Sequence, residues 1–179
     1  MADWPSQLDF GDCTILANVS GTELQKSNTD ECLGRFNSFS KFIRVVATSL
    51  RWLPFNRKFK GSPLQAEELN SARLKVLQFD QSVHFAREVR DIAYNKPILK
   101  CSKIRRLRPF RDEHGLLRVG SRMEEYPYVT FDEKYPIILD KRSKLSHMIA
   151  WDFHRILLHA GTNLILSAIS RKYDILCGK

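Results

Sequence analysis

The sequence predicts an α+β chain that is mainly helical, with a long helical hairpin, a small β-hairpin section and a final helical unit. Three observations predict this class. Two long segments carry apolar residues at three- and four-residue intervals, two short apolar runs are bounded by turn residues, and helical spacing returns near the end. We expect four regions: a flexible tether at 1–35, the helical hairpin at 36–97, a basic linker with the β-hairpin section at 98–140, and the final helical unit at 141–179.

The charge balance favours a polyanionic partner. Lys and Arg number 29 against 20 Asp and Glu, and the formal net charge of +9 suits nucleic acid or an anionic membrane surface. The most apolar stretch, 156–169, is interrupted by polar residues and too short to cross a bilayer. The first residues lack the basic and apolar regions of a signal peptide. We therefore expect an intracellular protein whose four scattered cysteines are reduced.

The first expected helix spans 39–53 and ends at Pro54. Three of its basic residues, Lys41, Arg44 and Arg51, fall away from the apolar face, so the helix is amphipathic. The apolar face is formed by Phe39, Phe42, Ile43, Val46, Leu50 and Leu53.

The second expected helix has a well-marked start. Ser62 can cap it, Pro63 suits its first position, and Gln65 stands where a capping box places Glu or Gln. The segment 95–97, Asn-Lys-Pro, stops it, and His84 is interpreted as a surface or packing residue rather than a ligand. Matching apolar stripes predict that the two helices pack as an antiparallel hairpin. The second stripe consists of Leu69, Ala72, Val76, Phe79, Val83, Ala86 and Val89.

A basic run follows and contains no acidic residue. This run either binds phosphate groups with an affinity that depends on salt, or it is a solvated linker between two folded units. Its cations are Lys100, Lys103, Arg105, Arg106, Arg108 and Arg111.

The β-hairpin section begins at a turn, 112–115, whose Gly115 can adopt a positive φ. The run 116–120 reads as one strand, and 136–139 reads as another with Pro136 at its permitted first position. We expect these two strands to pair around 126–128.

The final region predicts two short helices. Ser143 is the expected cap of the first helix, and Gly161 is its expected C-terminal stop. The first stripe is Leu145, Met148, Ile149, Phe153 and Ile156. The second helix is expected to turn Leu164, Ile165, Ala168 and Ile169 inward and Arg171 and Lys172 outward, in a helix-turn-helix layout.

His154 and His159 are the candidate metal ligands. On a continuous helix five residues place two side chains roughly 140° apart, so they converge only if the helix ends between them. Two neutral imidazoles would then offer half of the four ligands that structural Zn²⁺ needs. In the alternative interpretation one histidine packs and the other is exposed.

Several segments resemble polyproteins of BEL/Pao-type long-terminal-repeat retrotransposons, in the order and at the spacing of that family. The most specific are 108–110 with Asp112, 115–120, 134–139, and His154-x4-His159-Ala160-Gly161. The helical segments around 44–47 and 63–72 match as well, so that the resemblance runs from about Trp4 to the end.

The resemblance implies a segment that follows RNase H and leads into the zinc-binding domain of integrase. His154 and His159 look like its two histidine ligands, while its Cys-x2-Cys pair would lie beyond Lys179, so zinc binding is expected to be weak or absent. The departures from the family pattern are Ser121 and Cys177 for glycines, Tyr135 for a histidine, Asp140 for a proline and Asp174 for a tryptophan.

The expected function is non-catalytic. The sequence shows no paired-aspartate polymerase turn, no RNase H carboxylate cluster and no integrase acidic triad, which the parent polyprotein would carry elsewhere. We expect DNA or other integrase-like chains as partners, a nuclear location if the chain acts as integrase does, and neither a membrane nor a small-molecule substrate. The alternatives are a helical protein-interaction scaffold or a transposon remnant with no function of its own. The expected nucleic-acid-binding residues are Lys100, Lys103, Arg105, Arg106, Arg108, Arg171 and Lys172.

Overall fold

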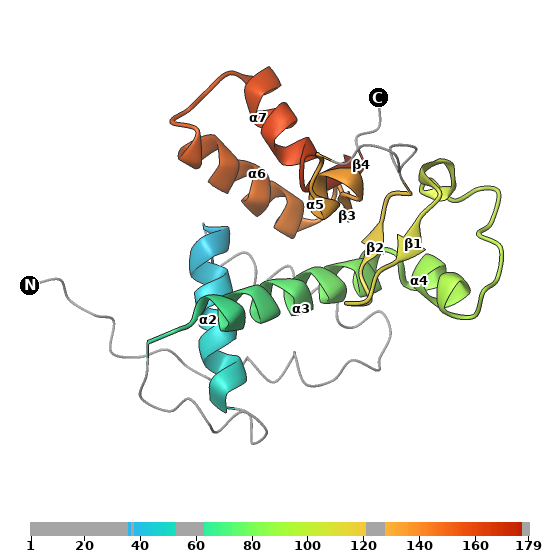
Figure 1. Ribbon diagram of the computed structural model, residues 1–179, viewed down its shortest axis with the longest axis horizontal. Coiled ribbons are helices and arrows are strands. Elements are labelled where there is room, and N and C mark those ends of the chain that lie inside the picture. The colour runs from blue at the N-terminus through green and yellow to red at the C-terminus, as the bar shows by residue number, and fades with distance from the viewer. Residues whose placement is uncertain (1–35, 37, 53–62, 121–127, 177–179) are drawn as a thin grey trace, which may run out of the picture.

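The computed structural model describes residues 36, 38–52, 63–120 and 128–176, and in this part of the chain the fold is mixed α/β and mainly helical (Figure 1). None of its helices is long and apolar enough to span a membrane. The helices are α2 (Phe39–Trp52), α3 (Ala66–His84), α4 (Ala86–Ala93), the 3-10 turn η3 (Arg105–Leu107), α5 (Phe131–Lys134), α6 (Lys144–Ile156) and α7 (Thr162–Ser170). The strands are β1 (Phe110–Arg111), β2 (Leu117–Arg118), β3 (Ile137–Asp140) and β4 (Tyr173–Leu176).

Helix α2 agrees with the expected helix, and its apolar face is in the main core, where Ile43, Val46 and Ala47 are buried. The predicted last position, Leu53, and the stop at Pro54 lie outside the described residues.

Helix α3 begins one turn later than predicted. Its N-cap is Gln65, whose side chain and that of Glu68 form the capping box, whereas Pro63 precedes the helix and Ser62 lies outside the described residues. The expected single helix is broken at Phe85, which has φ −124° and ψ 30°. Phe85 is buried in a second, smaller core with Ile104, and the break lets α4 follow a new direction along that core.

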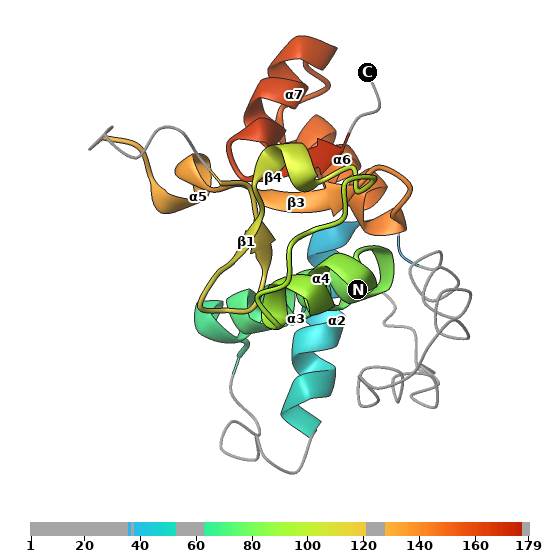
Figure 2. The ribbon, with the colours of Figure 1, turned by 90° about the vertical axis from the view of Figure 1, so that its right-hand side faces the viewer.

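The predicted antiparallel hairpin of α2 and α3 is not formed. The two helices pack on each other, and the Arg51 guanidinium binds the Glu68 carboxylate through Nε–Oε1 and Nη2–Oε2 contacts of 2.6 Å and 2.5 Å. However, Figures 1 and 2 show α2 crossing α3 steeply rather than running beside it. Helix α2 also contacts α6, so its apolar face is shared between two neighbours.

The sheet has the order β1-β2-β3-β4. As the sequence predicts, 112–115 is a turn with Gly115 at φ 75°, and β2 pairs with β3, here antiparallel through Arg118 and Ile137. Two strands were not predicted: β1, which the turn joins to β2, and β4, which pairs in parallel with β3. Most of the crossing expected at 126–128 lies outside the described residues.

Helices α6 and α7 pack on each other, and Ser143 caps α6 as predicted by accepting a hydrogen bond from the Leu145 backbone N–H. Two expectations are wrong. Ile156 and Leu164 were expected to face inward, but their exposed fractions are 69% and 57%. Gly161 does not stop α6, because it has φ −61° and is the N-cap of α7.

Candidate nucleic-acid interface and histidine pair

The structure brings His154 and His159 together. Helix α6 ends at Ile156, and Leu158 and His159 then adopt left-handed φ values of 50° and 61°. This reversal returns the His159 ring to the last turn of α6, where its Nδ1 lies 2.7 Å from Nε2 of His154. The condition for convergence is therefore met, because α6 ends between the two histidines. The left-handed backbone at Leu158 and His159 ends it, rather than Gly161.

The pair offers two nitrogens of the kind that bind zinc. Nitrogens bound tetrahedrally to one Zn²⁺ at 2.0–2.1 Å lie about 3.3 Å apart, so the 2.7 Å hydrogen bond would have to open and the rings turn before both lone pairs faced one ion. Both nitrogens can act as ligands once the shared proton leaves. Within the described residues, no third His, Cys, Asp or Glu gathers with them. The residues therefore fit two of four zinc ligands.

The segment 100–108, here called the basic loop, is folded rather than extended. Ile104 is fully buried in the second core, and Leu107 packs beside it. The Ser102 hydroxyl donates to the Glu88 carboxylate at 2.7 Å. Ser102 and Ile104 thus attach the loop to α4 and to the sheet, while its cations stay exposed to solvent.

A close backbone contact fixes the end of the basic loop. The Gly120 N–H donates to the Leu107 carbonyl at 3.0 Å, and a Cβ on Gly120 would lie only 2.4 Å from the Arg108 carbonyl oxygen. Arg108 itself has a left-handed φ of 45°. Because only glycine permits this approach, the neighbouring strand determines where the loop ends.

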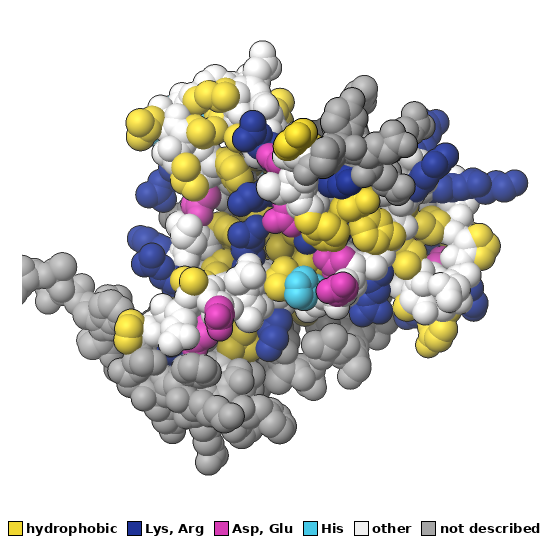
Figure 3. All heavy atoms as spheres, in the orientation of Figure 1, with side chains coloured by type: hydrophobic (Ala, Val, Ile, Leu, Met, Phe, Trp, Pro, Cys, Tyr) yellow, Lys and Arg dark blue, Asp and Glu magenta, His cyan; other side chains and the backbone are white. Residues whose placement is uncertain are grey.

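Five of the predicted nucleic-acid-binding residues line one hollow of about 910 Å³ together with Cys101 and Ser102, and no acidic residue joins them. All five are exposed, and none forms an ion pair with another residue that the structure describes. Dark blue side chains project from the right-hand side of the molecule, where this loop lies (Figure 3). The five residues are Lys100, Lys103, Arg105, Arg106 and Arg108.

The other two predicted residues lie apart from the basic loop. Arg171 and Lys172 line a different hollow, of about 690 Å³, with Asp132 and Glu133. The Arg171 Nε lies 3.8 Å from the Glu133 carboxylate, which partly offsets its charge. The predicted set is therefore divided between two surfaces.

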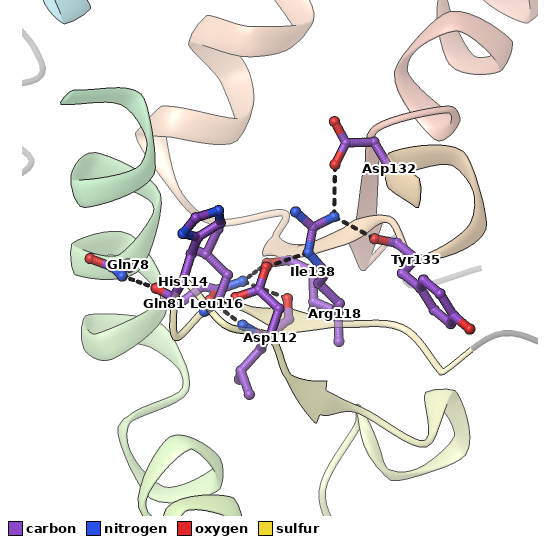
Figure 4. A network of polar contacts seen from close by, with 10 residues as sticks. Gln78, Gln81, Asp112, His114, Leu116, Arg118, Asp132, Tyr135 and Ile138 are labelled. Atoms are coloured by element: carbon purple, nitrogen blue, oxygen red, sulfur yellow. Dashed lines mark hydrogen bonds and ion pairs between the residues drawn. The ribbon is translucent and has the colours of Figure 1, made fainter. Parts of the chain in front are cut away.

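A buried arginine organises the β-hairpin section (Figure 4). Arg118 is 4% exposed and donates to the Asp112 carboxylate at 2.6 Å, to the Asp132 carboxylate at 2.9 Å and to the Tyr135 carbonyl at 2.7 Å. Its guanidinium also lies 4.9 Å from the centre of the Phe131 ring. These contacts join β2 to α5 and engage Nε and Nη1 of the guanidinium.

Sequence reasoning missed the residues that hold the basic loop in place. Ile104 is an isolated apolar residue in a charged run, and this interruption is the one signal that pointed to an anchor. Gly120 could be read only as the end of a strand, because its close approach to Arg108 depends on the tertiary fold. The chain was also compared with protein-family models, curated proteins and solved structures, and nothing in the three collections matches it.

Proposed function

We propose that the chain is a non-catalytic nucleic-acid-binding segment of a BEL/Pao-type retrotransposon polyprotein, leading into the zinc-binding domain of integrase. The observation that carries the proposal is the basic loop: five exposed cations on an anchored segment, around one hollow with no acidic residue. The sequence resemblance supplies the family, and the histidine pair agrees with it.

The anchoring of the basic loop favours binding to phosphate. Lys and Arg on a disordered tail lose backbone freedom when they bind, whereas the loop is already held by Ile104 and the Gly120 contact. The residues that line the hollow include no aromatic ring that could stack on a base. Contacts to phosphate position a protein without reading sequence. We therefore propose that binding is sequence-tolerant and depends on salt.

The histidine pair supplements this function. Two imidazoles alone bind zinc weakly, because a structural site needs its full ligand set to offset the cost of ordering. We propose that His154 and His159 contribute two ligands, and that the family's later cysteine pair would complete the site.

The test is a salt series of fluorescence-anisotropy titrations with a labelled DNA duplex. For each phosphate contact, the slope of log K against log salt changes by about 0.9. The variant Arg105→Glu/Arg106→Glu should lose at least about tenfold in affinity and make the slope shallower by about 2. Lys141→Glu/Arg142→Glu is the matched control, since it reverses two exposed cations in the turn after β3. Equal losses of affinity in the two variants would show that binding depends only on the net charge of the chain, which would contradict the proposal.

An interaction scaffold is the second candidate, on a surface other than the one expected. Much of the α2 and α3 stripes, including Ile43, Val46, Ala72 and Val76, is already buried in the chain's own core. However, five large apolar side chains of α6, α7 and their connection are more than half exposed, namely Trp151, Ile156, Leu158, Leu164 and Leu166. Self-association that persists in high salt and is abolished by Leu164→Glu/Leu166→Glu in sedimentation velocity would favour this function.

A further inference from the structure

A groove of about 460 Å³ lies between α2, α3 and α6. In Figure 3 it is the hollow between the part of the surface formed by α6 and the part formed by α2 and α3, and hydrophobic side chains are visible within it. Its volume lies in the range of about 300–1,000 Å³ that is usual for binding sites. Its apolar lining includes Leu69, Phe153 and Ile156, which are partly or largely exposed, and the buried Ile43 and Ile149.

Three cations surround this apolar lining: Arg44 of α2, Arg73 of α3 and Lys172 in the turn before β4. None of them forms an ion pair with another described residue. Arg73 instead lies over the Tyr173 ring, 5.8 Å from its centre. Three positive charges thus face one hollow without a carboxylate partner.

The one carboxylate in the lining is already engaged. Asp152 accepts hydrogen bonds from the Ser38 hydroxyl at 3.2 Å, the Ser40 backbone N–H at 2.9 Å and the Ser40 hydroxyl at 3.0 Å. These bonds hold the start of α2 against α6. Asp152 supplies one negative charge against the three cations, so it offsets only part of their charge. The groove therefore has an apolar floor and a net positive rim.

The apolar surface extends past the groove. Ile156 lines it and is 69% exposed, and the neighbouring hollow of about 690 Å³ shares Phe153 and Lys172 with it. A small compact ligand would cover only part of this surface. A phosphate backbone would pair with the cations but leave the apolar floor in water. A peptide with apolar and acidic side chains would cover the apolar floor and pair with the cations.

We propose that this groove binds an acidic, amphipathic peptide segment of a partner protein, whose apolar side chains cover the floor and whose carboxylates pair with Arg44, Arg73 and Lys172. The proposal does not rest on nucleic-acid binding, because the groove and the basic loop share no residue.

The test selects peptides from a random phage-displayed library on the immobilised full chain. Selected peptides are then labelled and titrated by fluorescence anisotropy against the wild type and two variants. Arg44→Glu/Lys172→Glu reverses two exposed groove cations, and Lys141→Glu/Arg142→Glu is the matched control. We expect enrichment of acidic residues beside apolar ones, and an affinity loss of about tenfold or more in the groove variant alone.

Three outcomes would overturn the proposal: no enrichment, enrichment without acidic residues, or equal binding by the groove variant and the wild type. A loss of duplex DNA binding in the groove variant, with peptide binding intact, would assign the groove to nucleic acid instead. Circular dichroism checks that the variants fold, and if the glutamates unfold the chain, Arg44→Gln/Lys172→Gln replaces them with a smaller expected loss.

Discussion

Gln81 and Leu117 exchange two hydrogen bonds although they are 36 residues apart in the chain. The Leu117 N–H donates to Gln81 Oε1 at 2.7 Å, and Gln81 Nε2 donates back to the Leu117 carbonyl at 2.9 Å and to the Ile138 carbonyl at 2.8 Å (Figure 4). The Gln81 side chain is 1% exposed. One amide therefore satisfies backbone groups of both β2 and β3 and fixes α3 against the sheet.

Replacing this amide should destabilise the fold. Gln81→Leu leaves one buried N–H and two buried carbonyls without a partner, and we expect a loss of about 3 kcal/mol or more in the free energy of unfolding. Urea denaturation followed by circular dichroism measures it. Gln78→Leu is the control, because Gln78 lies less than one turn away and, among the described residues, its side chain donates to the carbonyl of the exposed His114. Similar losses of unfolding free energy in both variants would show that the reciprocal bonds with Leu117 add no more stability than a single surface bond.

The histidine pair predicts weak zinc binding that needs both rings. With only half of a structural ligand set, we expect a dissociation constant weaker than about 1 µM. Calorimetric titration with ZnCl₂ measures it. His159→Asn should abolish the binding, while His147→Asn, which changes another exposed histidine of α6, should leave it intact. Tight one-to-one binding, or binding unaffected by His159→Asn, would exclude the half-site.

The contact between Arg51 and Glu68 predicts a pH-dependent contribution to stability. The hydrogen bond from Arg51, and secondarily the one from the Gln65 backbone N–H, lower the pKa of Glu68 to about 2. Because the folded-state pKa is depressed, the stabilisation is complete above the ordinary carboxyl pKa. It is lost as pH falls from there through the folded value of about 2.

This pH dependence is measured as the difference in unfolding free energy between the wild type and Glu68→Gln. The difference should shrink as pH falls from about 5 to about 2, and it should be modest because the pair is near the surface. Glu67→Gln, which changes an exposed carboxylate in the same turn, should give no such trend. A difference for Glu68→Gln that is constant with pH would contradict the assignment.

Local patterns predicted the elements whose signals are local. The spacing of apolar residues predicted α2 and α6 nearly at their bounds, and Ser143 marked the start of α6. The predicted capping box placed the start of α3 one turn too early, because Gln65 is the N-cap rather than the third residue of the helix. The break at Phe85 was not predictable in this way, because it follows from burial of that ring beside Ile104, a residue distant in sequence. Strand β4 depends likewise on its partner β3.

The candidate site was also predicted only in part, because its arrangement depends on contacts between residues that are distant in the sequence. The charges of the basic loop are visible in the sequence, but their shared hollow depends on Ile104 and Gly120. From the sequence, the two histidines could be expected to converge only if the helix ended between them. The left-handed backbone at Leu158 and His159 carries no glycine signal, and Gly161 indicated the wrong position for the turn.

The basic loop also predicts an effect that changes no charge. A Cβ at position 120 would lie 2.4 Å from the Arg108 carbonyl oxygen, so Gly120→Ala must displace the end of the loop. If nucleic acid binds to cations in their observed positions, the affinity for a DNA duplex should fall about tenfold at constant net charge.

Gly161→Ala is the matched control for this last prediction, because a Cβ at Gly161 meets no atom within 4 Å and its φ is −61°. Anisotropy titrations of both variants, with thermal unfolding to confirm that each is folded, make the comparison. The anchored-loop mechanism requires a loss for Gly120→Ala alone. If a folded Gly120→Ala variant keeps the wild-type affinity and salt slope, binding depends on how many cations the basic loop carries. The position of the loop then has no part in binding.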